Sequence, residues 1–333
     1  MASDYQIFVR CKEAIVKKLW ATVAKIHLVG VGLDCRETDR FVQTQLDIQS
    51  FRQQENPWHG PDLSCTKKAL SNRFFRMARS FRSLSFVATN TPEALASREE
   101  LIRTYGYTPP EDADVLVVLG GDGFMLQNLH DTMNSGRLIY GMNRGSVGFL
   151  MNDYRIEDLP ERIAIATEND FHPLKMTALS EDGTQTVALA INEVSLLRQS
   201  YQAAKLRVLI DGQERLDELI CDGLMVATPV GSTAYNLSAH GPILPLDAPL
   251  LALTPVCPFR PRRWRGALLP DRVTVTIEVL EERKRPVNAV ADNIEVKSVL
   301  TVQIEQAKDI TARILSDPDH SWSERILAEQ FAN

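Results

Sequence analysis

From residue 84 onwards, the hydrophobic pattern alternates between short apolar runs and segments of helix type. Residues 115–119 (Val-Leu-Val-Val-Leu) are continuously β-branched or aliphatic, which is typical of a strand buried on both faces of a parallel sheet. The same pattern predicts strands over 84–88 and 138–142, and helices over 92–105, 124–134 and 157–167. Residues 84–168 are therefore predicted to form an α/β domain.

Past residue 171 the periodicity changes to the alternation of β-strands. Turn dipeptides such as Asp182-Gly183 and Asp211-Gly212 separate the apolar runs. The predicted strands cover 186–197, 205–210, 272–280, 286–290 and 298–305. We therefore expect a β-rich domain over residues 169–317, followed by a C-terminal helix over residues 318–333.

Residues 1–83 form a basic N-terminal extension. They carry 14 Lys plus Arg and 8 Asp plus Glu, a net +6, whereas residues 84–333 carry a net −12. One interpretation is a basic amphipathic helix for an anionic membrane surface or an organelle presequence, because cationic and aromatic residues alternate near its end. We favour a poorly ordered extension together with a native start at Met77, which would give a protein of 257 residues.

The composition excludes several classes of protein. With 333 residues, 44% hydrophobic and 24% charged, the chain is typical of a globular protein with two domains. No apolar run approaches the roughly 20 residues that cross a bilayer, so we expect no integral membrane contact. The 5 cysteines are widely spaced and include no Cys-x-x-Cys, which argues against a disulfide framework or a zinc site and favours the cytoplasm.

The strongest candidate for chemistry directly follows the strand predicted over 115–119. Gly120, Gly121 and Gly123 lie where open α/β sheets bind ligands, and glycine lets a phosphate approach the backbone. The helix that follows offers unpaired N–H groups to an anion. Asp122 would repel phosphate unless it binds a metal or accepts a proton from a reacting hydroxyl, which favours a catalytic role. An ordinary helix N-cap is the open alternative.

Two further features accompany these glycines, a second glycine-rich loop and a polar pair within a strand. Residues 141–150 contain three more glycines after the next predicted strand, and we expect this loop to face the first one across a cleft. Asn192 and Glu193 interrupt an apolar strand with side chains that point to opposite faces. An amide and a carboxylate suit a vicinal diol such as ribose, and a half-exposed strand edge is an equally open interpretation.

Residues 222–235 give the most specific local pattern. They are typical of a strand, a Pro/Gly turn and a helix whose N-terminus is capped by Ser232 or Thr233. Small side chains at that N-terminus leave room for a flat base, and Tyr235 is placed to stack on it.

Taken in order, these motifs resemble those of the NAD kinase family. The chain contains Gly-Gly-Asp-Gly after a strand, then Gly-x-Asn-x-Gly-x-x-Gly-Phe-Leu and Asn-Glu. It continues with Asp-Gly-x-x-x-x-Thr-Pro-x-Gly-Ser-Thr-Ala-Tyr and Ser-Ala-x-Gly-Pro. The first motif is shared with diacylglycerol-type lipid kinases and phosphofructokinases, whereas residues 228–235 single out NAD kinases. The resemblance covers about residues 84–333.

The resemblance implies a reaction, a fold and partners. The reaction would transfer the γ-phosphoryl group of ATP, or of polyphosphate, to the 2′-hydroxyl of the adenosine ribose of NAD, giving NADP. The fold would be that of the NAD kinase and diacylglycerol kinase-like superfamily, an α/β nucleotide-binding domain plus a β-sandwich-like domain, in a homodimer or homotetramer. Mg²⁺ or another divalent cation would accompany ATP, held mainly by the substrate phosphates.

The resemblance also implies roles for individual residues. Asp122 would be the general base or orienting carboxylate, beside a phosphate loop formed by Gly120, Gly121 and Gly123. Asn192 and Glu193 would hold ribose hydroxyls, and Asp222 would lie on the nicotinamide side. The residues in contact with adenine would be Phe149, Thr233, Ala234, Tyr235 and Ser238. The supporting residues would be Asn143, Gly231 and Asp292.

The sequence departs from the family pattern at Asn293, because many members have Asp-Gly where this chain has Asp292-Asn293. Since Asn also tolerates positive φ, we expect the turn to survive. Three other functions stay open. A related lipid or sugar kinase would leave Tyr235 unexplained, and a non-catalytic dinucleotide sensor would lack the carboxylate present at Asp122. Nucleic-acid binding by the extension is the weakest alternative, and we expect no nucleic-acid partner.

Overall fold

The computed structural model describes residues 81–145, 148–318, 325 and 331, all within one compact unit, Arg76–Asn333. The predictions for residues 1–80, including the start at Met77, and for most of the C-terminal helix lie outside the described residues. Within the described ranges, no helix is long and apolar enough to span a membrane.

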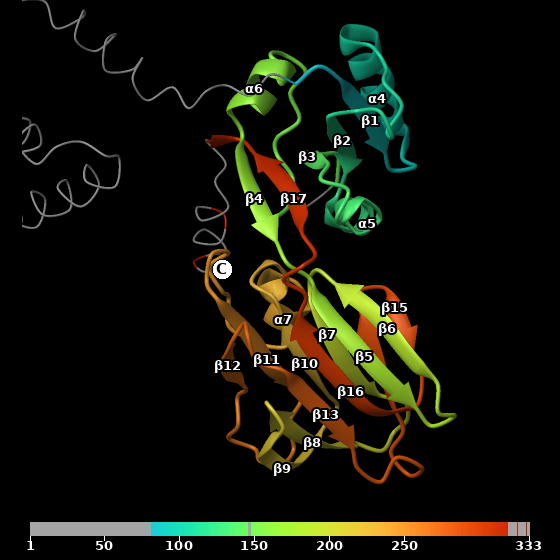
Figure 1. Ribbon diagram of the computed structural model, residues 1–333, viewed down its shortest axis with the longest axis vertical. Helices are drawn as coiled ribbons and strands as arrows, with labels where there is room; N and C mark the ends of the chain where they lie inside the picture. Colours follow the sequence, from blue (N-terminus) through green and yellow to red (C-terminus); the bar gives the residue numbers. More distant parts are fainter. Residues whose placement is uncertain (1–80, 146–147, 319–324, 326–330, 332–333) are drawn as a thin grey trace, which may run out of the picture. The chain divides into compact units, whose positions relative to one another are not determined.

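The first part of the unit is an α/β domain built on a five-stranded sheet (Figure 1). The predicted strands pair in parallel and are β1 (Leu84–Ala88), β2 (Val115–Gly120) and β3 (Leu138–Asn143). The helices that alternate with them are α4 (Pro92–Tyr105), α5 (Asp122–Thr132) and α6 (Leu159–Ile165). The predicted alternation is confirmed, although α5 begins two residues earlier than expected.

Strand β2 is buried on both faces, as its continuous apolar run predicts. Val117 packs in a hydrophobic cluster that includes Leu101 of α4 and Ile163 of α6. Its neighbour Val118 packs in a second cluster with Leu129 of α5. The helices therefore cover both faces of the sheet, and the carboxyl end of β2 leads directly into the glycines and α5.

Two strands that follow α6 in the chain complete this sheet. They are β4 (Thr167–Phe171) and β17 (Ala312–Ser316), and the strand order is β1-β2-β3-β17-β4. Strand β17 pairs in parallel with β3 and antiparallel with β4. The division expected at residue 168 therefore does not follow the sheets, because the chain returns to the first sheet after completing the second domain.

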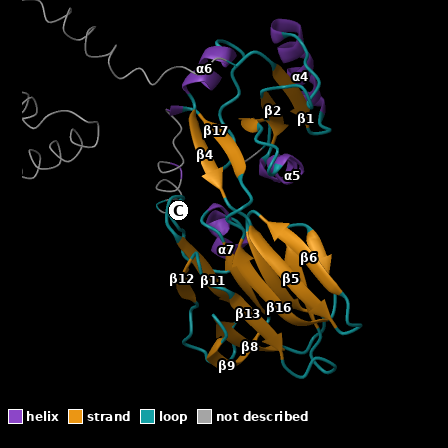
Figure 2. Cartoon of the chain, viewed as in Figure 1, coloured by secondary structure: helices purple, strands orange, loops and turns teal. Residues whose placement is uncertain are grey.

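The remaining strands form two six-stranded sheets (Figure 2). The two sheets share one hydrophobic core. In order, the first sheet contains β12 (Ala267–Pro270), β11 (Leu250–Val256), β10 (Gly223–Ala227), β7 (Glu193–Arg198), β14 (Val287–Ala291) and β15 (Ile294–Val296). The second contains β6 (Gln185–Ala190), β5 (Leu174–Ser180), β16 (Val299–Gln306), β13 (Val275–Val279), β8 (Ala204–Ile210) and β9 (Gln213–Cys221). This arrangement confirms the predicted fold class.

The strand predicted over 186–197 is in fact two strands in different sheets. Strand β6 pairs with β5, whereas β7 pairs with β10 and β14, so the chain crosses between the sheets at Ile191 and Asn192. The prediction of one strand is wrong because both halves face the same core, which makes the apolar pattern continuous. Asn192 and Glu193 therefore lie at a crossing and not on opposite faces of one strand.

The turn between β14 and β15 forms with the residues Asp292-Asn293. Its positive φ falls on Asp292, at 50°, so the tolerance expected of Asn293 is used by its neighbour. His240 also has a positive φ, of 62°. Asp and His are among the residues that adopt this conformation more readily than most.

Candidate functional site

Asp122 is the first residue of α5, and its carboxylate is tied to the loop after β3. Its Oδ2 accepts a hydrogen bond from the backbone N–H of Phe149, and its Oδ1 accepts one from Leu150, both at 2.8 Å. Gly121 occupies the N-cap position, so the interpretation of Asp122 as the N-cap is wrong. Burial raises the pKa of Asp122, while the two N–H groups and the charge of Arg325 act in the opposite direction.

The two glycine-rich loops pack directly against each other. The backbone N–H of Arg144 donates to the carbonyl oxygen of Gly120 at 2.7 Å. A Cβ on Gly145 would lie only 3.3 Å from the Cα of Gly121. Asn143 stiffens this second loop, because its Oδ1 accepts a hydrogen bond from the backbone N–H of Gly145 at 2.8 Å. The loops are thus in contact here, where the sequence led us to expect a cleft.

Open space lies beside Gly123 instead. A Cβ on Gly123 would meet no atom within 4 Å, whereas one on Gly120 would lie 3.1 Å from the ring of Phe124. An anion therefore has room to approach the first turn of α5, where the first backbone N–H groups of a helix have no partner four residues earlier in it.

The turn formed by residues 191–193, called the 191–193 turn below, is held by the buried carboxylate of Asp292. Asp292 Oδ2 accepts a hydrogen bond from the backbone N–H of Ile191 at 2.6 Å. Its Oδ1 accepts from Asn192 at 3.0 Å and from Glu193 at 3.2 Å. His130 Nε2 is the fourth partner, 2.8 Å from Oδ2. One side chain thus fixes three successive amides.

Glu193 emerges from this turn with an unused acceptor. Burial, followed by the negative charge of Asp292, raises the pKa of Glu193 to about 7. Its Oε2 is buried and finds no hydrogen-bond partner among the residues that the structure describes. Because an unsatisfied buried acceptor is costly, this oxygen suits a hydroxyl group that a ligand donates. The side chain of the adjacent Asn192 is half-buried.

The start of the 228–235 segment presses on the same turn. Thr228 Oγ1 donates to the carbonyl of Ile191 at 2.6 Å, and the N–H of Thr228 donates to that of Asn192 at 2.9 Å. A Cβ on Gly231 would overlap the carbonyl group and Cα of Asn192. Glycine is therefore required at position 231 by close backbone approach. The sequence did not predict this role of Thr228, which is to hold the 191–193 turn by two hydrogen bonds.

The helix predicted after residue 229 is replaced by the 3₁₀ turn η1 (Val230–Thr233) and the one-turn helix α7 (Tyr235–Ser238). The capping roles predicted for Ser232 and Thr233 are wrong. Ser232 Oγ donates to the carbonyl of Pro229 at 2.7 Å, and Thr233 Oγ1 donates to that of Val230 at 3.4 Å. Both hydroxyls therefore close the turn that brings the chain past the 191–193 turn.

The other residues predicted to contact adenine lie at or just beyond this turn. Ala234 separates the two helical pieces and is half-buried. Tyr235 is also half-buried, and partial burial raises the pKa of its hydroxyl. Ser238 is exposed. These side chains have accessible surface, which a ligand needs.

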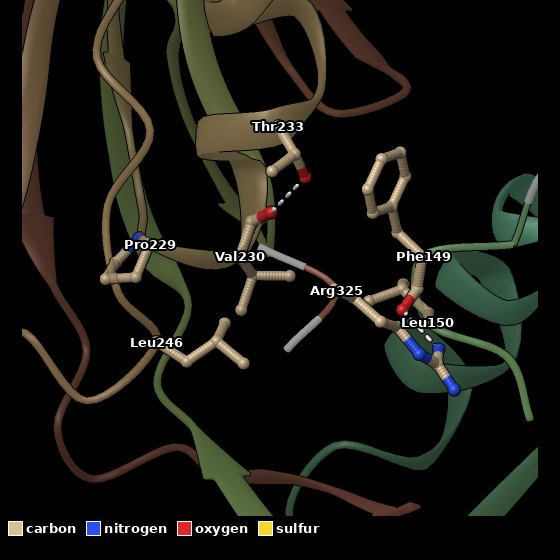
Figure 3. A pocket seen from close by; sticks show the side chains of 7 residues that line it. All are labelled: Phe149, Leu150, Pro229, Val230, Thr233, Leu246 and Arg325. Carbon is tan, nitrogen blue, oxygen red and sulfur yellow. Dashed lines mark hydrogen bonds between the residues drawn. The ribbon is translucent and has the colours of Figure 1, made fainter. Parts of the chain in front are cut away.

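A pocket brings Phe149 together with the 229–233 segment (Figure 3). The residues that line it are Phe149, Leu150, Pro229, Val230, Thr233, Leu246 and Arg325. Arg325 Nη1 donates to the carbonyl of Phe149 at 2.8 Å, which fixes the loop that also binds Asp122. Sequence reasoning missed Arg325 because no motif surrounds it.

Asp222 lies apart from this pocket, between β9 and β10. Its Oδ1 pairs with Arg198 Nε at 2.6 Å, and the two side chains are 41% and 35% exposed. The structure thus brings Asp122 and Phe149 together in one place, and Glu193 and Asp292 in another, with Asp222 in neither contact set.

Metal ligands are sparse in the described ranges, which contain no group of three or more His, Cys, Asp or Glu side chains placed to hold a metal ion. Asp122 and Asp292 already accept backbone hydrogen bonds. A Mg²⁺ ion at this site fits only if bound phosphates supply most of its oxygen ligands, which is its common mode of binding with nucleotides.

Comparison with known proteins gives the family. A family model described as the ATP-NAD kinase C-terminal domain matches residues 191–310. The NAD kinase of Rhizobium meliloti (strain 1021) is 68% identical over 257 residues, which cover 77% of this chain and 100% of that protein. The chain belongs to the NAD kinase family.

Solved structures of NAD kinases share the fold. Yeast NADH kinase in complex with NADH aligns with a TM-score of 0.66 and 22% identity over 75% of this chain and 87% of that one. The NAD kinase from Archaeoglobus fulgidus in complex with ATP aligns with a TM-score of 0.59 and 23% identity over 74% of this chain and 98% of that one. The NAD kinase family model includes the 191–193 turn and Asp292, whereas Asp122 precedes the matched range.

Proposed function

We propose that Asp122 is the general base for the phosphorylation of NAD to NADP, the reaction of the NAD kinase family. In this step the 2′-hydroxyl of the adenosine ribose gives its proton to the Asp122 carboxylate. The oxygen of that 2′-hydroxyl then forms a bond to the γ-phosphorus of ATP. At the same time the bond between the γ-phosphorus and the bridging oxygen of the departing ADP breaks. The products are NADP and ADP.

The observation that carries this assignment is the hydrogen bonding of the Asp122 carboxylate. Within the described part of the chain, each of its oxygens accepts one backbone hydrogen bond, at 2.8 Å. Each oxygen therefore keeps a lone pair for a substrate hydroxyl. The raised pKa of Asp122 moves the carboxylate toward the range in which a base works near neutral pH.

We assign the acceptor, NAD, to the surface around the 191–193 turn and the pocket of Figure 3. Asn192 and Glu193 hold the ribose hydroxyls, supported by the unpaired Oε2 of Glu193. The adenine contacts are Phe149, Thr233, Ala234, Tyr235 and Ser238, and Asp222 lies toward the nicotinamide. Phe149 and Thr233 line the same pocket, which supports this placement.

We assign the donor phosphates to the loop formed by Gly120, Gly121 and Gly123. The open space at Gly123 and the N-terminus of α5 support this assignment. ATP is the proposed donor, and polyphosphate is the alternative. Mg²⁺ or another divalent cation, held mainly by the donor's own oxygens, would neutralise phosphate charge.

The test is NADP formation by the purified protein with ATP, Mg²⁺ and NAD, scored with an NADP-specific dehydrogenase. We expect Asp122→Asn to lower kcat by about 10²–10⁴-fold while NAD binding survives. Activity within about tenfold of the parent would remove Asp122 from the base role. If the folded protein binds NAD but forms no NADP with ATP or polyphosphate, the result would favour the alternative function of a non-catalytic dinucleotide sensor.

We also propose that the protein is a cytoplasmic homodimer or homotetramer. Its described cysteines, Cys221 and Cys257, are free thiols, which agrees with a reducing compartment. Light scattering coupled to size-exclusion chromatography measures the assembly directly. A monomeric mass at working concentration would contradict the proposal.

A further inference from the structure

The contact of His130 with Asp292 joins the two domains of the site. His130 lies in the last turn of α5, and Asp292 lies in the β14–β15 turn, 162 residues away. The Nε2 to Oδ2 distance is 2.8 Å, the Asp292 side chain is 0% exposed, and the His130 side chain is 21% exposed. This is a well-formed hydrogen bond in a mostly water-excluded place, where such bonds are strong.

The His130 hydrogen bond completes the coordination of the carboxylate that holds the 191–193 turn. A carboxylate has about four lone-pair positions, and the backbone N–H groups of residues 191, 192 and 193 use three of them. His130 uses the fourth. Without this donor, the carboxylate loses one of its four hydrogen bonds, and the three amides that depend on its position are held less firmly.

Apolar packing provides a second, independent link between α5 and the 191–193 turn. Met125 and Leu129 of α5 share a hydrophobic cluster with Ile191 and with Val230 of η1. The first residue of the same helix is Asp122, eight residues before His130, which is about 12 Å along a helix. One rigid element thus carries the proposed base at one end and the contact to the 191–193 turn at the other.

We propose that His130 is a positioning residue for NAD: through Asp292 it fixes the turn that presents Asn192 and Glu193, and it sets that turn relative to the helix of Asp122. This inference rests on the proposed function. His130 does not contact a reacting atom. It acts by fixing the angle at which the ribose is held with respect to the base.

The experiment compares His130→Leu, which removes the donor, with His130→Gln, which places an amide N–H near the position of Nε2. We measure the Kd of NAD without donor, the KM values of NAD and ATP, and hydrogen exchange of the amides at 191–193. His130→Leu is expected to raise the Kd and KM of NAD by about tenfold or more and to speed that exchange similarly, because a hydrogen bond to a charged group is lost. The KM of ATP is expected to stay within about threefold, and His130→Gln to restore most of each effect.

His172→Leu is the matched control. His172 is also half-buried, and its Nδ1 donates a hydrogen bond to the carbonyl of Ile310 at 2.9 Å, not to a residue of the 191–193 turn or to Asp292. It is expected to change stability without changing NAD binding. The proposal is overturned if His172→Leu raises the Kd of NAD as much as His130→Leu, or if His130→Leu changes neither the Kd nor the exchange. It is also overturned if His130→Gln is as damaged as His130→Leu.

Failure of the proposed function is distinguishable from failure of this inference. If the parent protein binds NAD but makes no NADP, the kinase assignment fails, while the Kd and exchange data still judge His130. If it does not bind NAD, exchange at residues 191–193 alone judges the link. Should His130→Leu not fold, His130→Asn replaces it, because the shorter amide cannot reach Asp292, and equal NAD binding by His130→Asn and His130→Gln overturns the proposal.

Discussion

Two segments of this chain are each held by one aspartate, but the two aspartates are used differently. Asp122 accepts two backbone hydrogen bonds from the 149–150 segment, one on each oxygen. Asp292 accepts three from the 191–193 turn and a fourth from His130, and its side chain is wholly buried. The first carboxylate has acceptor capacity left for a substrate, and the second has none.

The difference distinguishes a carboxylate that only fixes the backbone from one that can also bind the substrate. At the 191–193 turn, Asp292 holds the backbone, and the neighbouring Glu193 keeps the unpaired oxygen. At the glycine loop, Asp122 both holds the backbone and is the proposed base. A substitution of Asp292 is therefore expected to act on stability and on NAD binding, whereas a substitution of Asp122 acts mainly on turnover.

The largest expected effect on stability belongs to Asp292→Asn. The amide replaces one oxygen with a donor that faces other donors, so two hydrogen bonds to a charged acceptor are lost, which costs about 3 kcal/mol or more. Asp122→Asn loses one such bond and is expected to cost about half as much. Urea unfolding of both variants measures the difference, and equal losses would contradict the contrast between the two carboxylates.

Glu193→Gln tests the buried carboxyl group next to Asp292 that has an oxygen left for a ligand. The folded pKa of Glu193, about 7, lies above its ordinary value of 4.5, so the folded state binds more protons between these values. The stability of the parent therefore falls as pH rises from 4.5 to 7, by on the order of 3 kcal/mol, and that of Glu193→Gln does not carry this loss.

Unfolding free energies measured at several pH values give the Glu193 effect as the difference between variant and parent. Glu305→Gln is the control, because Glu305 is 39% exposed and pairs with Lys175 at the surface. If the difference in unfolding free energy between Glu193→Gln and the parent stays constant from pH 4.5 to 8, the pKa of Glu193 is not raised in the folded state.

Gly231→Ala tests the close contact on the other side of the 191–193 turn. The added methyl group would overlap the backbone of Asn192, so we expect a loss of about 1–3 kcal/mol of stability, with weaker NAD binding. Gly123→Ala is the control for stability, because its Cβ has open space within α5, and alanine favours a helix by about 1 kcal/mol over glycine. Similar stability losses in both variants would rule out the contact as the cause.

The local sequence pattern was sufficient to predict those elements whose causes lie in residues close together in the sequence. The buried strand β2 follows from its unbroken apolar run, and α4 follows from Pro92 at its first position after Thr91, which caps it. The glycines after β2 predicted the place of Asp122. These features depend on residues that are neighbours in sequence, so their physical causes are visible there.

The rest depends on partners distant in sequence. Nothing local shows that β17 returns to the first sheet, or that the apolar run over 186–197 divides between two sheets at Ile191. The same holds for His130, whose role comes from Asp292, and for Arg325, whose partner is the carbonyl of Phe149. A partner far away in the sequence, whether a side chain or a backbone carbonyl, leaves no signature in the local pattern, so such contacts appear only in the structure.

The smallest expected effect concerns Asp222, which lies outside both carboxylate systems. Arg198→Gln breaks its ion pair, and since the two side chains are 35% and 41% exposed, stability should fall by less than about 1 kcal/mol. Lys175→Gln breaks a pair of similar exposure with Glu305 and is the matched control. If Asp222 lies on the nicotinamide side, only Arg198→Gln raises the KM of NAD, by about twofold to fivefold. Equal KM values in the two variants would place Asp222 away from the dinucleotide, and leave the 191–193 turn and the pocket of Figure 3 as the two parts assigned to it.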